Sequence, residues 1–153
     1  MARATTGAAG KTKVTFYDIA PDQTFALAVK LAQAAWEKEK RLIIRCHDAP
    51  HAAALDEHLW VFREDAFLPH EVCDDPQAMK DPTGRIVLTT RDARPIAGDI
   101  LLQLAPCELG FAGQFEVVID LVDHSDQARL EASRARYRAW LDAGTKPDMK
   151  QKV

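Results

Sequence analysis

The most reactive side chains of the sequence lie together in RCHDAPH, residues 45–51. Cys46, His47 and Asp48 are consecutive there, which suggests a cysteine nucleophile with an adjacent general base. The preceding residues have the composition of a short strand, and successive strand residues point to opposite faces of a sheet. Because Cys46 and His47 then cannot face each other, this chemistry is disfavoured. A small enzyme that uses Cys46, His47 or Asp48 remains the alternative hypothesis.

The spacing of the same cluster also disfavours a metal site. Structural zinc sites use four cysteine or histidine ligands at recognisable spacings. Cys46 and His51 are crowded together, whereas Cys73 and Cys107 stand alone. We therefore expect no metal. Cys46 is predicted to be a small buried residue at the end of a strand, and Asp48 to cap the helix that follows.

Motifs for nucleotide binding and for serine-hydrolase chemistry are absent from the sequence. It contains no G-x-G-x-x-G, no G-x-x-x-x-G-K-[ST] and no G-x-S-x-G. These motifs supply the glycine-lined phosphate loops and the nucleophile turn on which such chemistries depend. The formal net charge of −3 argues against a protein that coats nucleic acid by bulk electrostatics. We expect no cofactor and no catalytic residue.

The C-terminal part of the chain carries an unusual stripe. Residues 126–153 hold seven basic and four acidic side chains, although the whole chain is acidic. Leu130, Arg134, Tyr137 and Leu141 follow one another at spacings of four, three and four, which places them on one face of a helix. One interpretation is that the arginine stem packs while its guanidinium reaches water. The other is that the arginine binds an anion, such as a peptide carboxylate, beside an apolar pocket.

The hydrophobic pattern predicts one α/β domain with four to six strands. Strands separated by a helix imply parallel pairing, so the central sheet should be mostly parallel and flanked by helices. Thr24 or Asp22 is expected to cap the first helix, Ser125 the last, and Gly144 to end it. The predicted strands span residues 13–17, 41–46, 85–90, 99–104 and 115–122, and the predicted helices span residues 21–40, 49–60 and 125–143.

The two ends of the chain differ in composition from the part between them. Residues 1–12 are predicted to form a flexible cationic arm, residues 13–144 the domain, and residues 145–153 a flexible tail. The leader lacks the apolar core of a signal peptide, and no apolar run approaches the length of a membrane span. Three cysteines without a C-x-x-C pair are typical of a reducing compartment. We expect a cytoplasmic protein that does not contact membranes.

Several short motifs resemble those of one known family, in the same order along the chain. Phe16 and Tyr17 come first, followed by a helix and KRLIIRCHD. LDEHLW at residues 55–60, FLPH at residues 67–70, a strand of VVIDLV type and finally SRARYRAW at residues 133–140 complete the series. In this order the sequence resembles the chi subunit family of the bacterial DNA polymerase III holoenzyme. The segment between Cys73 and Asp99 and the N-terminal arm lie outside the resemblance.

The resemblance implies a non-catalytic accessory subunit of a DNA-directed DNA polymerase complex. Its fold would be a single Rossmann-like domain without a nucleotide-binding glycine loop. Chi subunits belong to the clamp loader, where they bind the psi subunit on one surface. On another surface they capture the acidic, phenylalanine-ended C-terminal tail of the single-stranded-DNA-binding protein. Contact with DNA would be mainly indirect. The resemblance leaves open whether this chain uses a divergent psi subunit or none, because no motif transfers that surface.

The resemblance also assigns site residues to this sequence. The apolar pocket for the terminal phenylalanine of the tail would combine two aromatic residues of the LDEHLW and FLPH motifs with a valine and the tyrosine of the C-terminal helix. Trp60 has a competing interpretation as an ordinary core residue. The complete expected site consists of Trp60, Phe67, Val122, Arg134, Tyr137 and Arg138, with Arg134 on the terminal carboxylate and Arg138 near the upstream acids.

Overall fold

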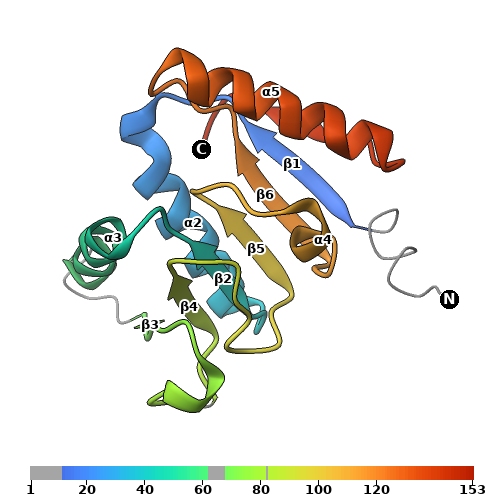
Figure 1. The fold of residues 1–153 in the computed structure, drawn as a ribbon. Coiled ribbons are helices and arrows are strands. Elements are labelled where there is room, and N and C mark those ends of the chain that lie inside the picture. The colour runs from blue at the N-terminus through green and yellow to red at the C-terminus, as the bar shows by residue number, and fades with distance from the viewer. Residues whose placement is uncertain (1–11, 62–67, 82) are drawn as a thin grey trace, which may run out of the picture.

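The seven-stranded sheet at the centre of the molecule is entirely parallel within the part of the chain that the structure describes. The computed structural model describes residues 12–61, 68–81 and 83–153 (Figure 1). The strand order is β3-β4-β2-β5-β6-β1-β7, which confirms the predicted α/β class and parallel pairing. The strands are β1 (Lys13–Tyr17), β2 (Leu42–Arg45), β3 (Glu71–Val72), β4 (Ile86–Thr89), β5 (Ile100–Gln103), β6 (Val117–Leu121) and β7 (Asp148–Lys150).

Helices cover both faces of this sheet (Figure 1). Helices α2 (Thr24–Glu37) and α3 (Ala49–Val61) pack on one face, and α4 (Leu109–Ala112) and α5 (Gln127–Asp142) pack on the other. Two short 3-10 turns, η1 (Pro21–Gln23) and η2 (Pro76–Ala78), lie in the connections.

Strand residues alternate between the two apolar cores. Ile44 in β2 and Leu102 in β5 belong to the core beneath α2 and α3. Ile43 and Leu101 precede them in the chain and belong to the core beneath α4 and α5. All four are fully buried. This burial on both faces explains why the strands read as continuous apolar runs such as LII and ILL rather than as alternating patterns.

The start of α3 agrees with the prediction from sequence. Cys46 is fully buried at the end of β2. Asp48 Oδ1 then accepts a hydrogen bond of 2.9 Å from the backbone N–H of His51, as an N-cap residue does.

The other two predicted N-terminal helix caps were wrong. Asp126, not Ser125, caps α5: its carboxylate accepts the N–H of Arg129 at 2.8 Å. Ser125 instead donates its N–H to Asp123 Oδ1 at 2.9 Å. Helix α2 starts after η1 without a side-chain cap, and the Thr24 hydroxyl donates to the carbonyl of Pro21. The preceding 3-10 turn already supplies acceptors for the first N–H groups, so neither Thr24 nor Asp22 is needed as a cap.

The C-terminal segment differs from the expected flexible tail. Gly144 has a φ of +92° and reverses the chain after α5, which confirms the prediction that this glycine ends the helix. The chain then forms β7, which pairs in parallel with β1, and the N–H of Asp18 donates to the carbonyl of Lys150 at 2.7 Å. A strand of three exposed residues is too short for its periodicity to predict it from the sequence. It forms because β1 offers an open edge.

At the other end, residues 1–11 of the expected arm lie outside the described residues. Thr12 is ordered against the fold: its hydroxyl donates to the carbonyl of Phe115 at 2.8 Å.

Candidate functional site

A groove of about 740 Å³ runs beside α5 on the sheet face that this helix covers. The four residues of the predicted stripe, Leu130, Arg134, Tyr137 and Leu141, all line it. Arg138, one turn after Arg134, lines it as well. The helical spacing therefore predicted correctly that these side chains share one face. The remaining lining residues come from β1 and the residue after it, from β7, from the segment after β6 and from α5: Phe16, Asp18, Val122, His124, Ser133, Asp142 and Met149.

The floor of this α5 groove is apolar and aromatic. The ring of Tyr137 packs edge-on against that of Phe16, with centroids 5.4 Å apart. Phe16 and Met149 are register partners on adjacent parallel strands, so both side chains point to the same face. Met149 is 46% exposed and Leu141 45% exposed. A large apolar side chain entering the groove would therefore meet both buried and accessible apolar surface.

The rim of the α5 groove carries two arginines without ion-pair partners among the described residues. Arg134 and Arg138 are both exposed, and none of the ion pairs within the described ranges includes either of them. His124 Nε2 lies 2.5 Å from Asp18 Oδ1 at the same groove. A guanidinium without a carboxylate partner keeps its donors available for a bidentate contact with an incoming anion.

Trp60 does not line the α5 groove. It lies near the C-terminal end of α3, where its ring contacts that of His70 at 4.4 Å between centroids. Helix α3 packs against β3 and β4, at the edge of the sheet opposite β7. Trp60 is 44% exposed, and its neighbours Val61 and Val72 are 64% and 43% exposed.

The expected grouping of site residues is therefore only partly met. Val122, Arg134, Tyr137 and Arg138 come together in the α5 groove, whereas Trp60 lies at the far edge of the sheet. Phe67 lies outside the described residues. The exposure of Trp60 also excludes its interpretation as an ordinary core residue. Motif order alone could not separate the two places, because it does not give the strand order.

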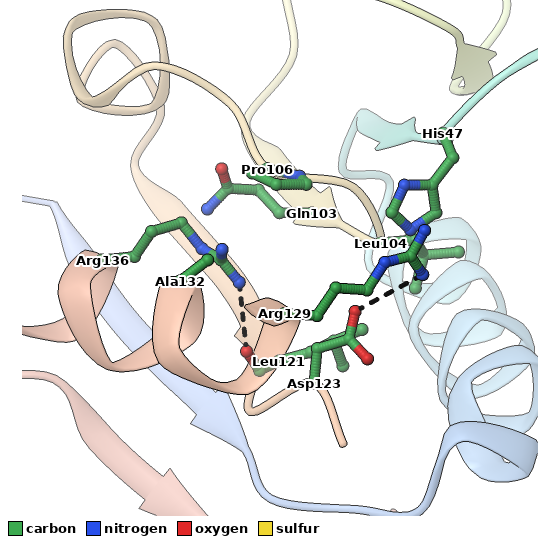
Figure 2. A pocket seen from close by; sticks show the side chains of 9 residues that line it. All are labelled: His47, Gln103, Leu104, Pro106, Leu121, Asp123, Arg129, Ala132 and Arg136. Carbon is green, nitrogen blue, oxygen red and sulfur yellow. Dashed lines mark hydrogen bonds and ion pairs between the residues drawn. The ribbon is translucent and has the colours of Figure 1, made fainter. Parts of the chain in front are cut away.

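A second concavity lies at the carboxyl ends of β2, β5 and β6 (Figure 2). Two adjoining cavities of about 180 and 210 Å³ share His47, Leu104, Leu121, Asp123 and Arg129. Open parallel sheets commonly bind ligands at this position, outside the carboxyl ends of the strands. No sequence motif pointed to this strand-end cleft. His47 and Asp123 follow β2 and β6, the two strands that flank β5 in the sheet.

The charges of the strand-end cleft are paired with each other. Arg136 holds the fully buried Asp120 through Nε to Oδ2 at 2.8 Å and Nη2 to Oδ1 at 3.2 Å. Burial raises the pKa of Asp120, and the bonds from Arg136 oppose this. Arg129 lies 3.8 Å from Asp123 at the mouth of the cleft (Figure 2). The cleft therefore offers an incoming ligand little uncompensated charge.

Cys46 and His47, on which the alternative enzyme hypothesis depends, are not activated for nucleophilic or acid–base catalysis. Burial raises the pKa of Cys46 to about 12, so its thiol stays protonated at neutral pH and is a poor nucleophile. Burial lowers the pKa of His47, and the nearby Arg129 lowers it further. The described residues contain no group of three histidine, cysteine or acidic side chains that could hold a metal ion. Within the same ranges, no helix combines the length and apolar character that a membrane crossing needs.

Comparison with known proteins places the chain in a family. The family described as DNA polymerase III chi subunit, HolC, matches residues 12–148. The chain belongs to this family. Three similar proteins are each named DNA polymerase III subunit chi. That of Pseudomonas aeruginosa is 29% identical over 136 residues, covering 87% of this chain and 92% of the relative.

The other two relatives agree with this assignment. The protein of Escherichia coli is 29% identical over 137 residues, or 85% of this chain and 91% of the relative. That of Haemophilus influenzae is 28% identical over 112 residues, or 73% and 76%. The chi subunit is an accessory part of the clamp-loader assembly of DNA polymerase III.

Proposed function

We propose that the α5 groove captures the acidic C-terminal tail of the single-stranded-DNA-binding protein. The chain would thereby link the clamp loader to single-stranded DNA that this protein coats, during DNA replication. The observation that carries the proposal is an apolar floor at Phe16 and Tyr137 beside Arg134 and Arg138, two arginines that have no ion-pair partner among the described residues.

The chemistry of such a tail matches the two halves of the groove. A terminal phenylalanine ring fits the floor between Tyr137, Val122 and Leu130, where aromatic and apolar contacts favour its burial. Its α-carboxylate accepts hydrogen bonds from the guanidinium of Arg134, which lies on the same face of α5. Upstream aspartates meet Arg138 and the solvent-exposed rim. Charge-assisted hydrogen bonds give this recognition its preference for a chain terminus over an internal phenylalanine.

A pull-down with two forms of the single-stranded-DNA-binding protein tests the proposal. The intact protein is expected to bind this chain, and the protein that lacks its acidic tail is not. A synthetic tail peptide with a free C-terminus should bind, whereas the same peptide with a C-terminal amide should bind at least about tenfold more weakly, since it loses a hydrogen bond to a charged group. Equal retention of the intact and the truncated protein would refute tail capture.

The psi subunit is the second partner that we propose for this chain. Its contact surface would be the apolar patch formed by Trp60, Val61 and Val72, all of which are substantially exposed. This patch lies at the β3 edge and the α5 groove at the β7 edge, so both partners fit at the same time. Trp60→Ala should abolish the complex with psi and leave tail binding unchanged. Loss of tail binding in this variant would place Trp60 in the tail site instead.

A further inference from the structure

We propose that the bound tail adds to the sheet as an eighth strand along the open edge of β7. This inference rests on the proposed tail capture and deepens it, because it states how the peptide backbone is held. Side chains of the groove then recognise the end of the tail, and the backbone of β7 binds the residues that precede it.

The edge of β7 is open in the part of the chain that the structure describes. β7 is the last strand of the sheet and pairs only with β1. Its three residues, Asp148, Met149 and Lys150, are all exposed. An edge strand of this kind presents a row of N–H and C=O groups with which an extended peptide can pair.

The hydrogen-bond register shows which groups of β7 face outward. The carbonyl of Lys150 accepts the N–H of Asp18, so the backbone groups of this residue point toward β1. In a parallel ladder, successive residues direct their backbone groups to opposite sides. The N–H and C=O of Met149 therefore point away from β1, toward the free edge.

Met149 also connects this edge to the α5 groove. Its side chain lines the groove beside Phe16, with which it shares a register position. An added strand bonded to the backbone of Met149 would lie directly alongside the apolar floor. A peptide in that position can insert its terminal aromatic side chain while its upstream residues stay extended along β7.

The charge around β7 selects an acidic peptide for this edge. Lys146, Lys150 and Lys152 surround the strand, and Asp148 is the single acid between residues 144 and 153. None of the three lysines forms an ion pair within the described ranges. Lysines on an edge strand oppose pairing with ordinary strands, because a neighbouring strand without acidic residues would leave the lysine charges without partners. An aspartate-rich strand relieves this repulsion and is accepted.

A backbone-methylation scan of the tail peptide tests the inference without changing the protein. Each amide of an acidic peptide that ends in phenylalanine is N-methylated in turn, and the affinity is measured by calorimetry. Methylation should weaken binding about threefold to tenfold at alternate positions, where an N–H donates to β7, and should have little effect between them. Uniform tolerance, or a loss without this alternation, would overturn strand addition.

A pair of protein variants provides the complementary measurement. Met149→Pro removes the outward N–H, whereas Met149→Ala removes only the side chain, so the proline variant should bind the unmodified peptide more weakly than the alanine variant. Arg134→Ala serves as the control for tail capture itself. If the affinity of the peptide depends on Arg134 but does not change on backbone methylation, strand addition is refuted and tail capture stands. If the unmodified peptide does not bind the wild-type protein, tail capture fails.

Discussion

The α5 groove and the strand-end cleft use arginines of the same helix in opposite ways. Arg129 and Arg136 point to the cleft, where Asp123 and Asp120 pair with them. Arg134 and Arg138 point to the groove, where no described carboxylate pairs with either. The cleft occupies the usual ligand position of a parallel sheet, yet its charges are already paired with one another. Charge that lacks a partner among the described residues, rather than a concavity at a favoured position, is what supports the proposed binding site.

The largest expected effect concerns the buried pair in the cleft. Asp120→Ala leaves Arg136 partly buried without its carboxylate, which should lower the free energy of unfolding by about 3–5 kcal/mol. Urea denaturation measures the loss. The double variant Asp120→Ala with Arg136→Ala should recover part of it, because no unpaired charge remains inside. If Asp120→Ala is as stable as the wild type, the structural assignment of this pair fails.

The affinity for the tail should depend on Arg134 in the α5 groove and not on Arg129 in the strand-end cleft. Arg134→Ala is expected to weaken binding of the tail peptide by about 1.5–3 kcal/mol, the scale of a hydrogen bond to a charged group. Arg129→Ala removes the same charge from the same helix and serves as the matched control. Fluorescence anisotropy of a labelled peptide distinguishes them. Equal losses in both variants would show that only the overall charge of the helix matters.

The second groove arginine should make a smaller, salt-sensitive contribution. Arg138→Ala is expected to cost about 0.5–1 kcal/mol of peptide affinity at low salt, in the range of exposed ion pairs. At about 1 M salt, where the Debye length is about 3 Å, the difference between variant and wild type should disappear. A loss that persists at high salt would instead place Arg138 in direct, desolvated contact with the peptide.

The sequence predicted the interior of this fold better than its edges. The strands near Ile43, Leu101 and Val118 are buried on both faces, so each appears as an apolar run whose assignment the structure confirms. Strands β3 and β7 lie at the two edges and are held by backbone pairing with a neighbour. Met149 and Val72 carry no pattern that distinguishes such a strand from a loop.

The candidate site shows the same division. The spacing of Arg134 and Tyr137 within one helix is a local property, so the sequence predicted their shared face. Whether Trp60 joins them depends on which strands separate α3 from α5. That order is set by crossover connections through the whole sheet, and no short motif records it.

The smallest expected effect is a pH dependence of stability that originates beside the cleft. His51 Nδ1 accepts the backbone N–H of His47 at 2.9 Å, which it can do only while that nitrogen carries no proton. Burial, and next the neighbouring His47, lower the pKa of His51 in the folded protein. The unfolded chain therefore binds more protons below about pH 6.5, the ordinary histidine pKa, and folding stability falls as the pH decreases from there.

His51→Asn isolates this effect, because an asparagine oxygen can still accept the N–H of His47 but does not titrate. The wild type should lose more stability than this variant between pH 7 and pH 5, as measured by urea denaturation at each pH. Tail binding at neutral pH should be the same in both, since His51 lines the cleft and not the α5 groove. An identical pH dependence in the two proteins would assign the acid sensitivity to other groups. A change in tail affinity would connect the cleft to the groove, against the separation of the two regions that their charges indicate.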